Sequence, residues 1–176
     1  MTSFPQRYLI EAKTIADERE VEAAALTPSV AEVSRYWLER RGDGIGPGPT
    51  DFRLDELPFD ILPMATLVDV HDDPLDFVYR FWGSGRTEQQ GADYTGRSIR
   101  AVEPDFVAEK IWREYVAVHT AKAPRHFISE RILDDGTRYE YHFIRLPLSR
   151  DGALVTQIFC TEFGRAITGP DIGAGH

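Results

Sequence analysis

Two short apolar runs separated by an acidic turn form the most regular pattern in the chain. Residues 64–70 and 77–82 are rich in β-branched and aromatic side chains, and turn residues stand between them at 71–74. Runs of this length and composition, separated by turn chemistry, predict two strands joined in a β-hairpin. A polar stretch follows and closes in a glycine-bracketed turn at 91–96, so short helical turns are expected after the hairpin.

Residues 105–120 carry the clearest helical pattern. Val107, Ile111 and Val118 recur on one flank, with Ala108, Trp112, Tyr115 and His119 beside them. The charged residues of the segment are expected on the solvent side; these are Glu109, Lys110, Arg113 and Glu114. This pattern predicts an amphipathic helix that covers a sheet.

The last third of the chain alternates between apolar and polar residues in three segments, 125–133, 138–148 and 154–163. Turn signals at 134–137 and 149–152 separate these segments. Short connections of this kind join antiparallel neighbours, so three consecutive strands are predicted.

The N-terminal region is less regular. Residues 1–17 have weak periodicity, whereas the glutamates and alanines of 17–26 favour a short helix. A clearer helix begins at Thr27 and Pro28, which suit the cap and the first helical position. Its apolar residues are Val30, Val33, Trp37 and Leu38. The glycines and prolines of 42–49 then oppose regular structure and predict a linker.

Together these elements predict an α+β fold in which about five antiparallel strands form one sheet, with short helices and one long helix on one face. The hairpin and the three later strands must share that sheet, because residues 64–70 would otherwise keep an open apolar edge. We expect an N-terminal helical arm and linker over 1–49, a main domain over 50–163 and a loose tail over 164–176.

Composition excludes several classes of protein. The chain has 176 residues, with 29 acidic against 20 basic residues and a formal net charge of -9. This excess disfavours a general nucleic-acid or anionic-membrane surface. A single cysteine, Cys160, excludes a disulfide within the chain. No apolar stretch approaches membrane-spanning length and the first residues are too polar for a signal peptide, so we expect a cytoplasmic protein.

Several motifs together resemble a known family. They are Trp37 with Arg41-Gly42, Asp51-Phe52, Leu57-Pro58, Leu62-Pro63, Asp69-Val70, the run from Tyr79 to Ser84, Asp93 to Gly96, and Leu146-Pro147-Leu148. Over residues 30–163 the chain is similar to short bacterial stand-alone PAS proteins. It departs from them at Thr50, where an arginine is usual, and in the glycine-rich segment 42–49.

The resemblance implies a PAS-like fold and a sensory or regulatory module rather than an enzyme. Such a module holds a small ligand or a protein partner between the curved sheet and the long helix. It would act alone in signalling, as a homodimer formed through the N-terminal helix. The ligand and the signalling partner are not identified by the sequence.

Six residues are candidates for binding that ligand: Arg80, Trp82, Trp112, Tyr115, His119 and His142. Arg80 alternates with Val78 and Trp82 on one face of the second strand, where it can clamp an anion or pair with Asp69 or Glu140 at the sheet rim. The aromatic residues can line a cavity, where Trp82 and Trp112 would approach each other, or simply form the core.

Cofactors are not expected on these residues. His119 and His142, with His126, invite a haem or metal interpretation, but a histidine on an aromatic face is normally a packed residue. Glu140 and His142 share a strand face without a third zinc ligand. Cys160 lies in the last strand, whereas the resemblance places the cysteine of light-sensing flavin domains in an early helix. We therefore expect neither metal, haem nor flavin.

Two alternative functions stay open. A small cup-shaped enzyme could use Asp69, Glu130 or Glu140 as a general base beside Tyr115, Tyr139 or Tyr141, although no motif fixes that geometry. An interaction scaffold would instead have a filled core. A cavity between Trp112 and the sheet would favour a sensor.

Overall fold

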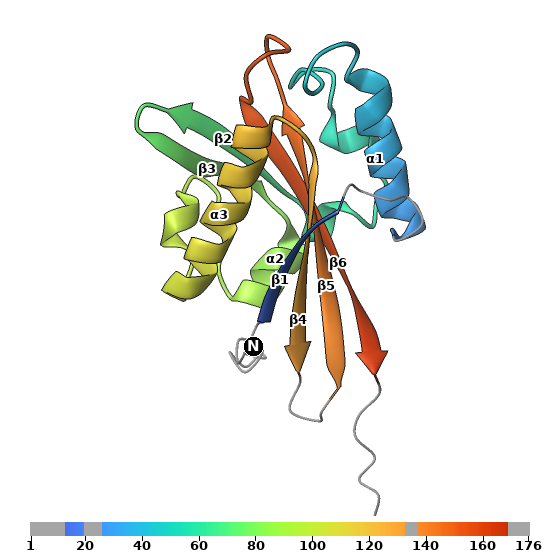
Figure 1. Cartoon of the computed structure of the whole chain (residues 1–176), viewed down its shortest axis with the longest axis vertical. Coiled ribbons are helices and arrows are strands. Elements are labelled where there is room, and N and C mark those ends of the chain that lie inside the picture. The colour runs from blue at the N-terminus through green and yellow to red at the C-terminus, as the bar shows by residue number, and fades with distance from the viewer. Residues whose placement is uncertain (1–12, 20–25, 133–136, 169–176) are drawn as a thin grey trace, which may run out of the picture.

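In the described part of the chain, one antiparallel sheet has six strands, and helices cover both of its faces (Figure 1). The computed structural model describes residues 13–19, 26–132 and 137–168. The strands are β1 (Lys13–Arg19), β2 (Thr66–Asp72), β3 (Leu75–Trp82), β4 (Arg125–Ile132), β5 (Arg138–Leu148) and β6 (Gln157–Thr168). They lie in the order β1-β4-β5-β6-β2-β3.

The pairing of β2 with β6 joins the two halves of the chain. Thr66 lies opposite Cys160 and Asp69 lies opposite Gln157 in antiparallel register. The predicted union of the early hairpin and the C-terminal strands in one sheet is therefore confirmed. Together with the helices described next, this sheet makes an α+β, PAS-like fold.

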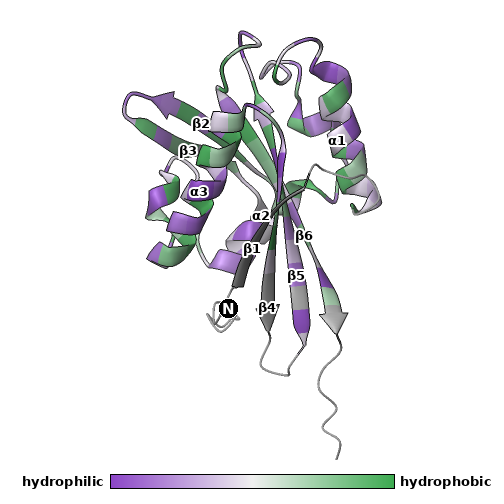
Figure 2. Ribbon diagram, in the orientation of Figure 1, coloured by the Kyte–Doolittle hydropathy of each residue, from purple (hydrophilic) through white to green (hydrophobic). Residues whose placement is uncertain are grey.

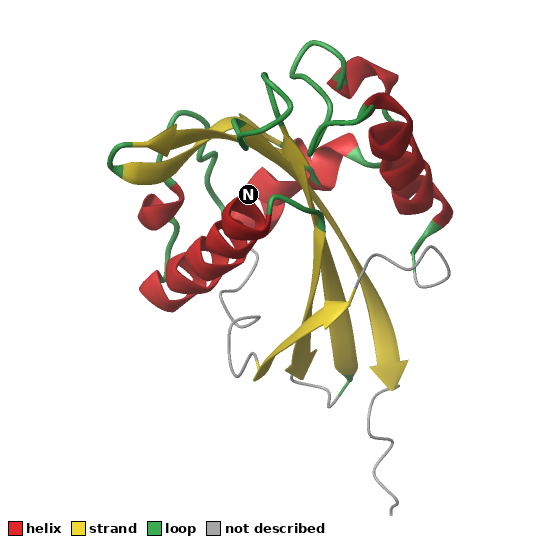
Figure 3. Ribbon diagram, turned by 45° about the horizontal axis from the view of Figure 1, so that its top comes forward, coloured by secondary structure: helices red, strands yellow, loops and turns green. Residues whose placement is uncertain are grey.

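One face of the sheet is covered by α2 (Ser84–Gln90), α3 (Asp105–Ala121) and the short 3-10 helix η5 (Ile99–Ala101). The buried flank of α3 includes Ile111, Tyr115 and Val118, as the helical periodicity predicts. These side chains belong to one hydrophobic cluster with Phe77 of β3 and Phe143 of β5. The sheet curves over α3, which Figure 3 shows.

The other face is covered by α1 (Pro28–Arg40), with the 3-10 helices η3 (Leu54–Glu56) and η4 (Leu62–Met64) in the segment that follows. Thr27 caps α1 by accepting from Val30 N–H, and Pro28 occupies its first turn, as predicted. Val30, Val33 and Trp37 pack in a second cluster whose sheet members are Leu67, Ile144, Leu146, Leu148 and Phe159. Figure 3 shows the sheet between α1 and α3, and Figure 2 shows that hydrophobic residues line much of the strands there.

The prediction for the N-terminal residues is wrong in one respect. Residues 17–19 were expected to begin a helix, but they belong to β1, which extends the sheet to six strands; residues 20–25 lie outside the described residues. Thr14 lies opposite Ser129 of β4, so the sheet edge offers backbone partners to this segment. Hydrogen bonds to that edge outweigh the local helix preference of glutamate and alanine.

The C-terminal strand is also longer than expected. β6 continues to Thr168, five residues into the segment predicted to be a loose tail. Gly164 lies opposite Tyr141, and Thr168 lies opposite Arg138. The long β5 strand therefore supplies backbone partners that carry the ladder past the end of the apolar pattern.

Segment 42–49 is irregular, as its glycines and prolines predict, and it is also packed. Gly46 is buried so close to β5 that a Cβ atom would lie 2.2 Å from the Pro147 carbonyl oxygen. Ile45 N–H donates to the Gly152 carbonyl at 3.0 Å. Only glycine allows this approach, so the segment holds α1 against the sheet.

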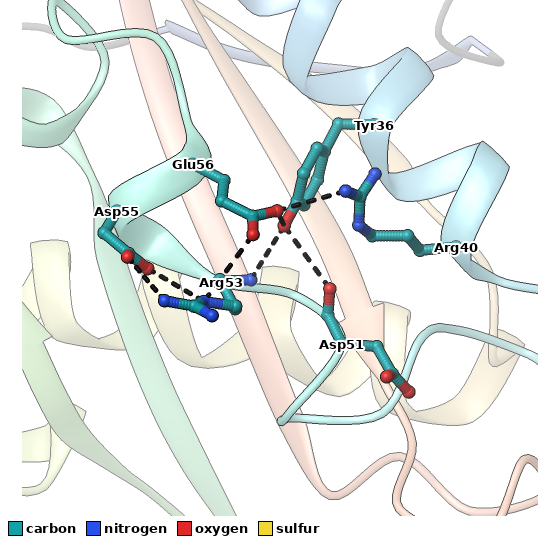
Figure 4. A network of polar contacts seen from close by, with 6 residues as sticks. All are labelled: Tyr36, Arg40, Asp51, Arg53, Asp55 and Glu56. Atoms are coloured by element: carbon teal, nitrogen blue, oxygen red, sulfur yellow. Dashed lines mark hydrogen bonds and ion pairs between the residues drawn. The ribbon is translucent and has the colours of Figure 1, made fainter.

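A polar network fastens α1 to the chain that follows it (Figure 4). The Tyr36 hydroxyl donates to Glu56 at 2.7 Å and accepts from Arg53 N–H at 3.1 Å. Arg40 also donates to Glu56, at 3.0 Å, and its guanidinium lies 3.6 Å from the Tyr36 ring centroid. Most of the network is exposed to water, so we assign it an orienting role rather than a large stabilising one.

Candidate ligand-binding site

A cavity of about 250 Å³ lies where α2, the first half of α3 and strands β4, β5 and β6 meet. Ile111 and Phe143 contribute apolar walls. The polar lining includes Arg86, Lys110, Ser129, Arg145 and Glu162. Buried charges of this kind are rare in protein cores unless they are paired or serve a site.

Arg86 and Glu162 form a buried ion pair on one side of the cavity. Their Nη1 and Oε2 atoms lie 2.5 Å apart, and both side chains are almost fully buried. Arg86 belongs to α2 and Glu162 to β6, so the pair ties the short helix to the sheet. The Arg86 guanidinium also lies 5.0 Å from the Trp82 ring centroid.

A second buried pair ties α3 to β5. Arg145 donates to Glu114 Oε2 from Nε at 3.0 Å and from the Nη2 atom at 2.5 Å. Lys110 approaches the other carboxylate oxygen to 3.0 Å. Burial alone would raise the pKa of Glu114, but the charges of Arg145 and Lys110 outweigh it and hold that pKa below its ordinary value.

Two buried polar atoms at the cavity lack partners. Among the described residues, neither Arg86 Nε nor Ser129 Oγ has a hydrogen-bond partner within the protein. Both residues line the cavity, and both are at least nine-tenths buried. A buried donor without a partner costs about 1–3 kcal/mol, so these atoms mark places where a bound molecule would be stabilised.

Trp82 and Tyr115 lie in the core behind this lining. The Trp82 ring packs against Tyr79 at 4.8 Å and Tyr94 at 5.1 Å between centroids. The Tyr115 hydroxyl lies 3.3 Å from Thr66 Oγ1, and burial raises the pKa of Tyr115 to about 12. Both residues support the site from behind, as core aromatics do.

Trp112 lies further along α3 and faces a second, more open hollow. Its ring meets Phe77 edge to face at 5.2 Å, and the Arg100 guanidinium lies 3.9 Å from its centroid. Trp82 and Trp112 thus pack against different parts of the same hydrophobic cluster.

Arg80 is exposed at the sheet rim and hydrogen-bonds Asp69, with Nε 2.8 Å from Oδ1. Gln157 donates to the same Asp69 oxygen at 2.8 Å. Strict alternation, which placed Arg80 beside Trp82, is broken by a β-bulge. Phe81 lies opposite Leu67 but Tyr79 lies opposite Val68, so Arg80 is the extra residue and Trp82 turns to the face of Tyr79. Of the two interpretations of Arg80, the pairing with Asp69 is the one observed.

The two histidines lie apart from the cavity and from each other. His119, in the last turn of α3, contacts Asp72 Oδ1 at 3.0 Å. His142 is buried with His126 and Glu140, its ring nitrogens lying 2.6 Å from His126 Nε2 and 2.5 Å from Glu140 Oε1. His142 also stacks on Phe163, which packs against the cluster under α1. The structure therefore does not bring the six predicted residues together.

Sequence patterns do not single out the residues that converge at the cavity, such as Arg86 and Arg145. The predicted solvent-facing position of Glu114 is wrong. Glu114 is buried, although the residue before it, Arg113, is exposed. The available signal was its spacing: Glu114 follows Ile111 by three residues and precedes Val118 by four, on the apolar flank. Arg145 similarly alternates with Phe143 in a buried strand.

Among the described residues, no three His, Cys, Asp or Glu side chains are arranged to hold a metal ion. The helices of the same part of the chain include none long and apolar enough to cross a membrane.

No protein-family profile matches the chain, and no curated protein matches it. Among solved structures, a fungal LOV domain photoreceptor, described as linking blue light and oxidative stress, aligns with 63% of this chain and 78% of its own. The sequence identity is 17% and the TM-score is 0.36. The fold assignment rests on the strand order and the helix positions given above.

Proposed function

We propose that the protein is a sensory or regulatory module of PAS type that binds a small molecule in the cavity under α3. The single observation that carries the proposal is the cavity of about 250 Å³ between helix and sheet, lined by buried Arg86 and Ser129 atoms that lack partners among the residues that the structure describes. A filled core would be expected of a pure scaffold, so a cavity between α3 and the sheet favours a sensor over that alternative. Trp112, beside which the sequence places such a cavity, does not line this one and borders the second hollow instead.

The ion pairs around the cavity offer a route for the signal. Arg86 joins α2 to β6, whereas Arg145 and Glu114 join β5 to α3. A molecule bound at Arg86 or Arg145 gives the guanidinium a further partner beside the carboxylate, and so changes how strongly the ion pair holds its helix on the sheet. Binding would therefore shift the position of α2 or α3, and a protein partner could read that shift.

The structure supports the enzyme alternative less well than the sensor. Asp69 already accepts hydrogen bonds from Arg80 and Gln157, and Glu140 accepts from Arg165 and contacts His142. A general base needs a carboxylate that can reach a substrate proton. The side chain of Glu130 lies outside the described residues.

Homodimerisation and a cytoplasmic location stay predictions. The apolar face of α1 packs against its own sheet, while Leu38 on the same helix is exposed. A dimer through α1 would therefore have to use its outer surface, where Leu38 lies.

The proposal is tested by native mass spectrometry and absorption spectroscopy of freshly purified protein, with the variant Ser129→Leu as a comparison. We expect a small molecule to remain bound to the wild type and to be lost when leucine fills the cavity. Retention of the same molecule by Ser129→Leu would place the site elsewhere. Wild-type protein with no bound molecule, and no ligand-induced stabilisation, would favour the scaffold.

A further inference from the structure

We propose that the ligand of this cavity is a small monocarboxylate with an apolar body. This inference rests on the proposed function, since it names the chemical class of the molecule held under α3. Three observations carry it: the charge around the cavity, the unpartnered donors, and the apolar walls.

Among the described residues, the buried and partly buried charges around the cavity do not balance. Arg86, Lys110 and Arg145 supply three positive charges, whereas Glu114 and Glu162 supply two negative charges. At the mouth, exposed Glu109 and Arg113 cancel each other. Because excess charge is costly in a buried site, a ligand with one negative charge is the complementary partner.

The unpartnered donors match a carboxylate. In the described part of the chain, Arg86 uses Nη1 for Glu162 and leaves its Nε–H without a partner, and the Ser129 hydroxyl has no partner either. An ionised carboxylate only accepts hydrogen bonds, and it presents two oxygens. We infer that the ligand accepts from Arg86 Nε and Ser129 Oγ, in charge-assisted hydrogen bonds that need no rearrangement of the Glu162 pair.

The rest of the lining selects an apolar body. Ile111 and Phe143 are buried and form walls of the cavity, and Phe106 stands half-exposed at its mouth. The volume of about 250 Å³ limits the body to a short alkyl chain or one aromatic ring. Inorganic phosphate lacks any group for these walls, so the cavity disfavours it.

The test compares matched acids and amides by isothermal titration calorimetry and amide NMR shifts. The probes are phenylacetate against phenylacetamide, hexanoate against hexanamide, and inorganic phosphate. We expect the acids to bind at least about tenfold more tightly than the amides, because charged acceptors form the stronger hydrogen bonds. The shifts should centre on α2 and the first half of α3.

Ser129→Ala separates a binding role from a structural one. The Ser129 hydroxyl has no partner among the described residues, so its removal should leave the melting temperature unchanged or higher while weakening acid binding about five- to tenfold. Ser34→Ala is the matched control, because Ser34 Oγ is also buried without a partner but lies on α1. It should leave acid binding unchanged. Arg86→Lys keeps a charge opposite Glu162, lacks Nε and should weaken acid binding as well.

The outcomes distinguish the two proposals. If amides bind as well as acids, or phosphate binds and the acids do not, the carboxylate assignment is overturned while the cavity remains a ligand site. If neither acids, amides nor phosphate bind and no shifts appear near α3, both this inference and the proposed function fail. Unchanged acid affinity in Ser129→Ala and Arg86→Lys would also overturn the assignment.

Discussion

Arg145 donates two hydrogen bonds to a single carboxylate oxygen of Glu114, at 3.0 and 2.5 Å, inside the interface between β5 and α3. Both side chains are about 95% buried. The Arg145 guanidinium also lies 4.3 Å from the Tyr115 ring centroid, so it fills the space between helix and sheet as well as carrying charge. The long helix is thus held on its sheet by an ion pair set among aromatic side chains.

Removing the charge of Glu114 should destabilise the protein strongly. Glu114→Gln leaves Arg145 buried beside an uncharged partner, a change that costs about 3–5 kcal/mol. Urea unfolding followed by circular dichroism measures the loss. Arg53→Ala, which breaks the exposed pair with Asp55, is the matched control and should cost much less, because water screens that pair. Equal losses in the two variants would contradict a structural role for the buried pair.

Replacing both partners should cost less than removing one. The double variant Glu114→Leu with Arg145→Met substitutes apolar groups of similar size, which removes both buried charges. We expect it to recover at least about 1 kcal/mol of the stability lost in Glu114→Gln. The same urea titrations test this expectation, and a double variant less stable than Glu114→Gln would contradict it.

Stability should depend on pH through Glu114. Its pKa in the folded protein lies below the ordinary value of 4.5, so the unfolded chain binds a proton at higher pH than the folded one. The stability that ionised Glu114 contributes is therefore fully present above pH 4.5. It is lost as the pH falls through the lower pKa that Glu114 has in the folded protein. As the pH is lowered from 7 to 3, the free energy of unfolding should fall more steeply for the wild type than for Glu114→Gln. If the unfolding free energies of the two proteins changed in parallel with pH, groups other than Glu114 would cause the loss of stability at low pH.

Trp37→Phe tests the attachment of α1. The indole Nε1 donates to the Pro147 carbonyl at 2.8 Å in a buried contact. Phenylalanine keeps most of the apolar contact but leaves that carbonyl without its donor, so we expect a loss of about 1–3 kcal/mol in thermal or urea unfolding. Tyr36→Phe, in the more exposed network of the same helix, should cost less. An unchanged free energy of unfolding in Trp37→Phe would mean that the attachment of α1 contributes little to the stability of the fold.

Gly83→Ala tests the close contact at the start of α2. A Cβ atom there would lie 2.3 Å from the Pro63 carbonyl oxygen and 2.4 Å from that of Leu62, so backbone must move. We expect a loss of about 1–3 kcal/mol, with shifts in α2 and η4 in the NMR spectrum. The control is Gly91→Asn at the other end of α2, where φ is 76° and nothing lies within 4 Å; asparagine tolerates this conformation. Comparable losses in both variants would argue against the contact as the cause.

Strand β5 and helix α3 could be predicted directly from the sequence, because periods of 2 and 3.6 residues indicate which side chains share a face. The cap at Thr27 and the turns that follow β2 and β5 depend on neighbouring residues and could equally be predicted from the sequence. The α+β class follows from the order of these elements. The pairing of Arg80 with Asp69 was one of the options that the hairpin itself offered.

Contacts between distant segments decided the rest. β1 became a strand because the edge of β4 was available to it, and the bulge at Arg80 appeared only in the register with β2. Glu114 could be buried only because Arg145 stands opposite it, 31 residues away. His142 faces α1 rather than the cavity because of the way the sheet is sandwiched between helices. Local sequence encodes the faces of each element, whereas the partner of a buried charge, and the space left beside it, arise only when the elements pack together.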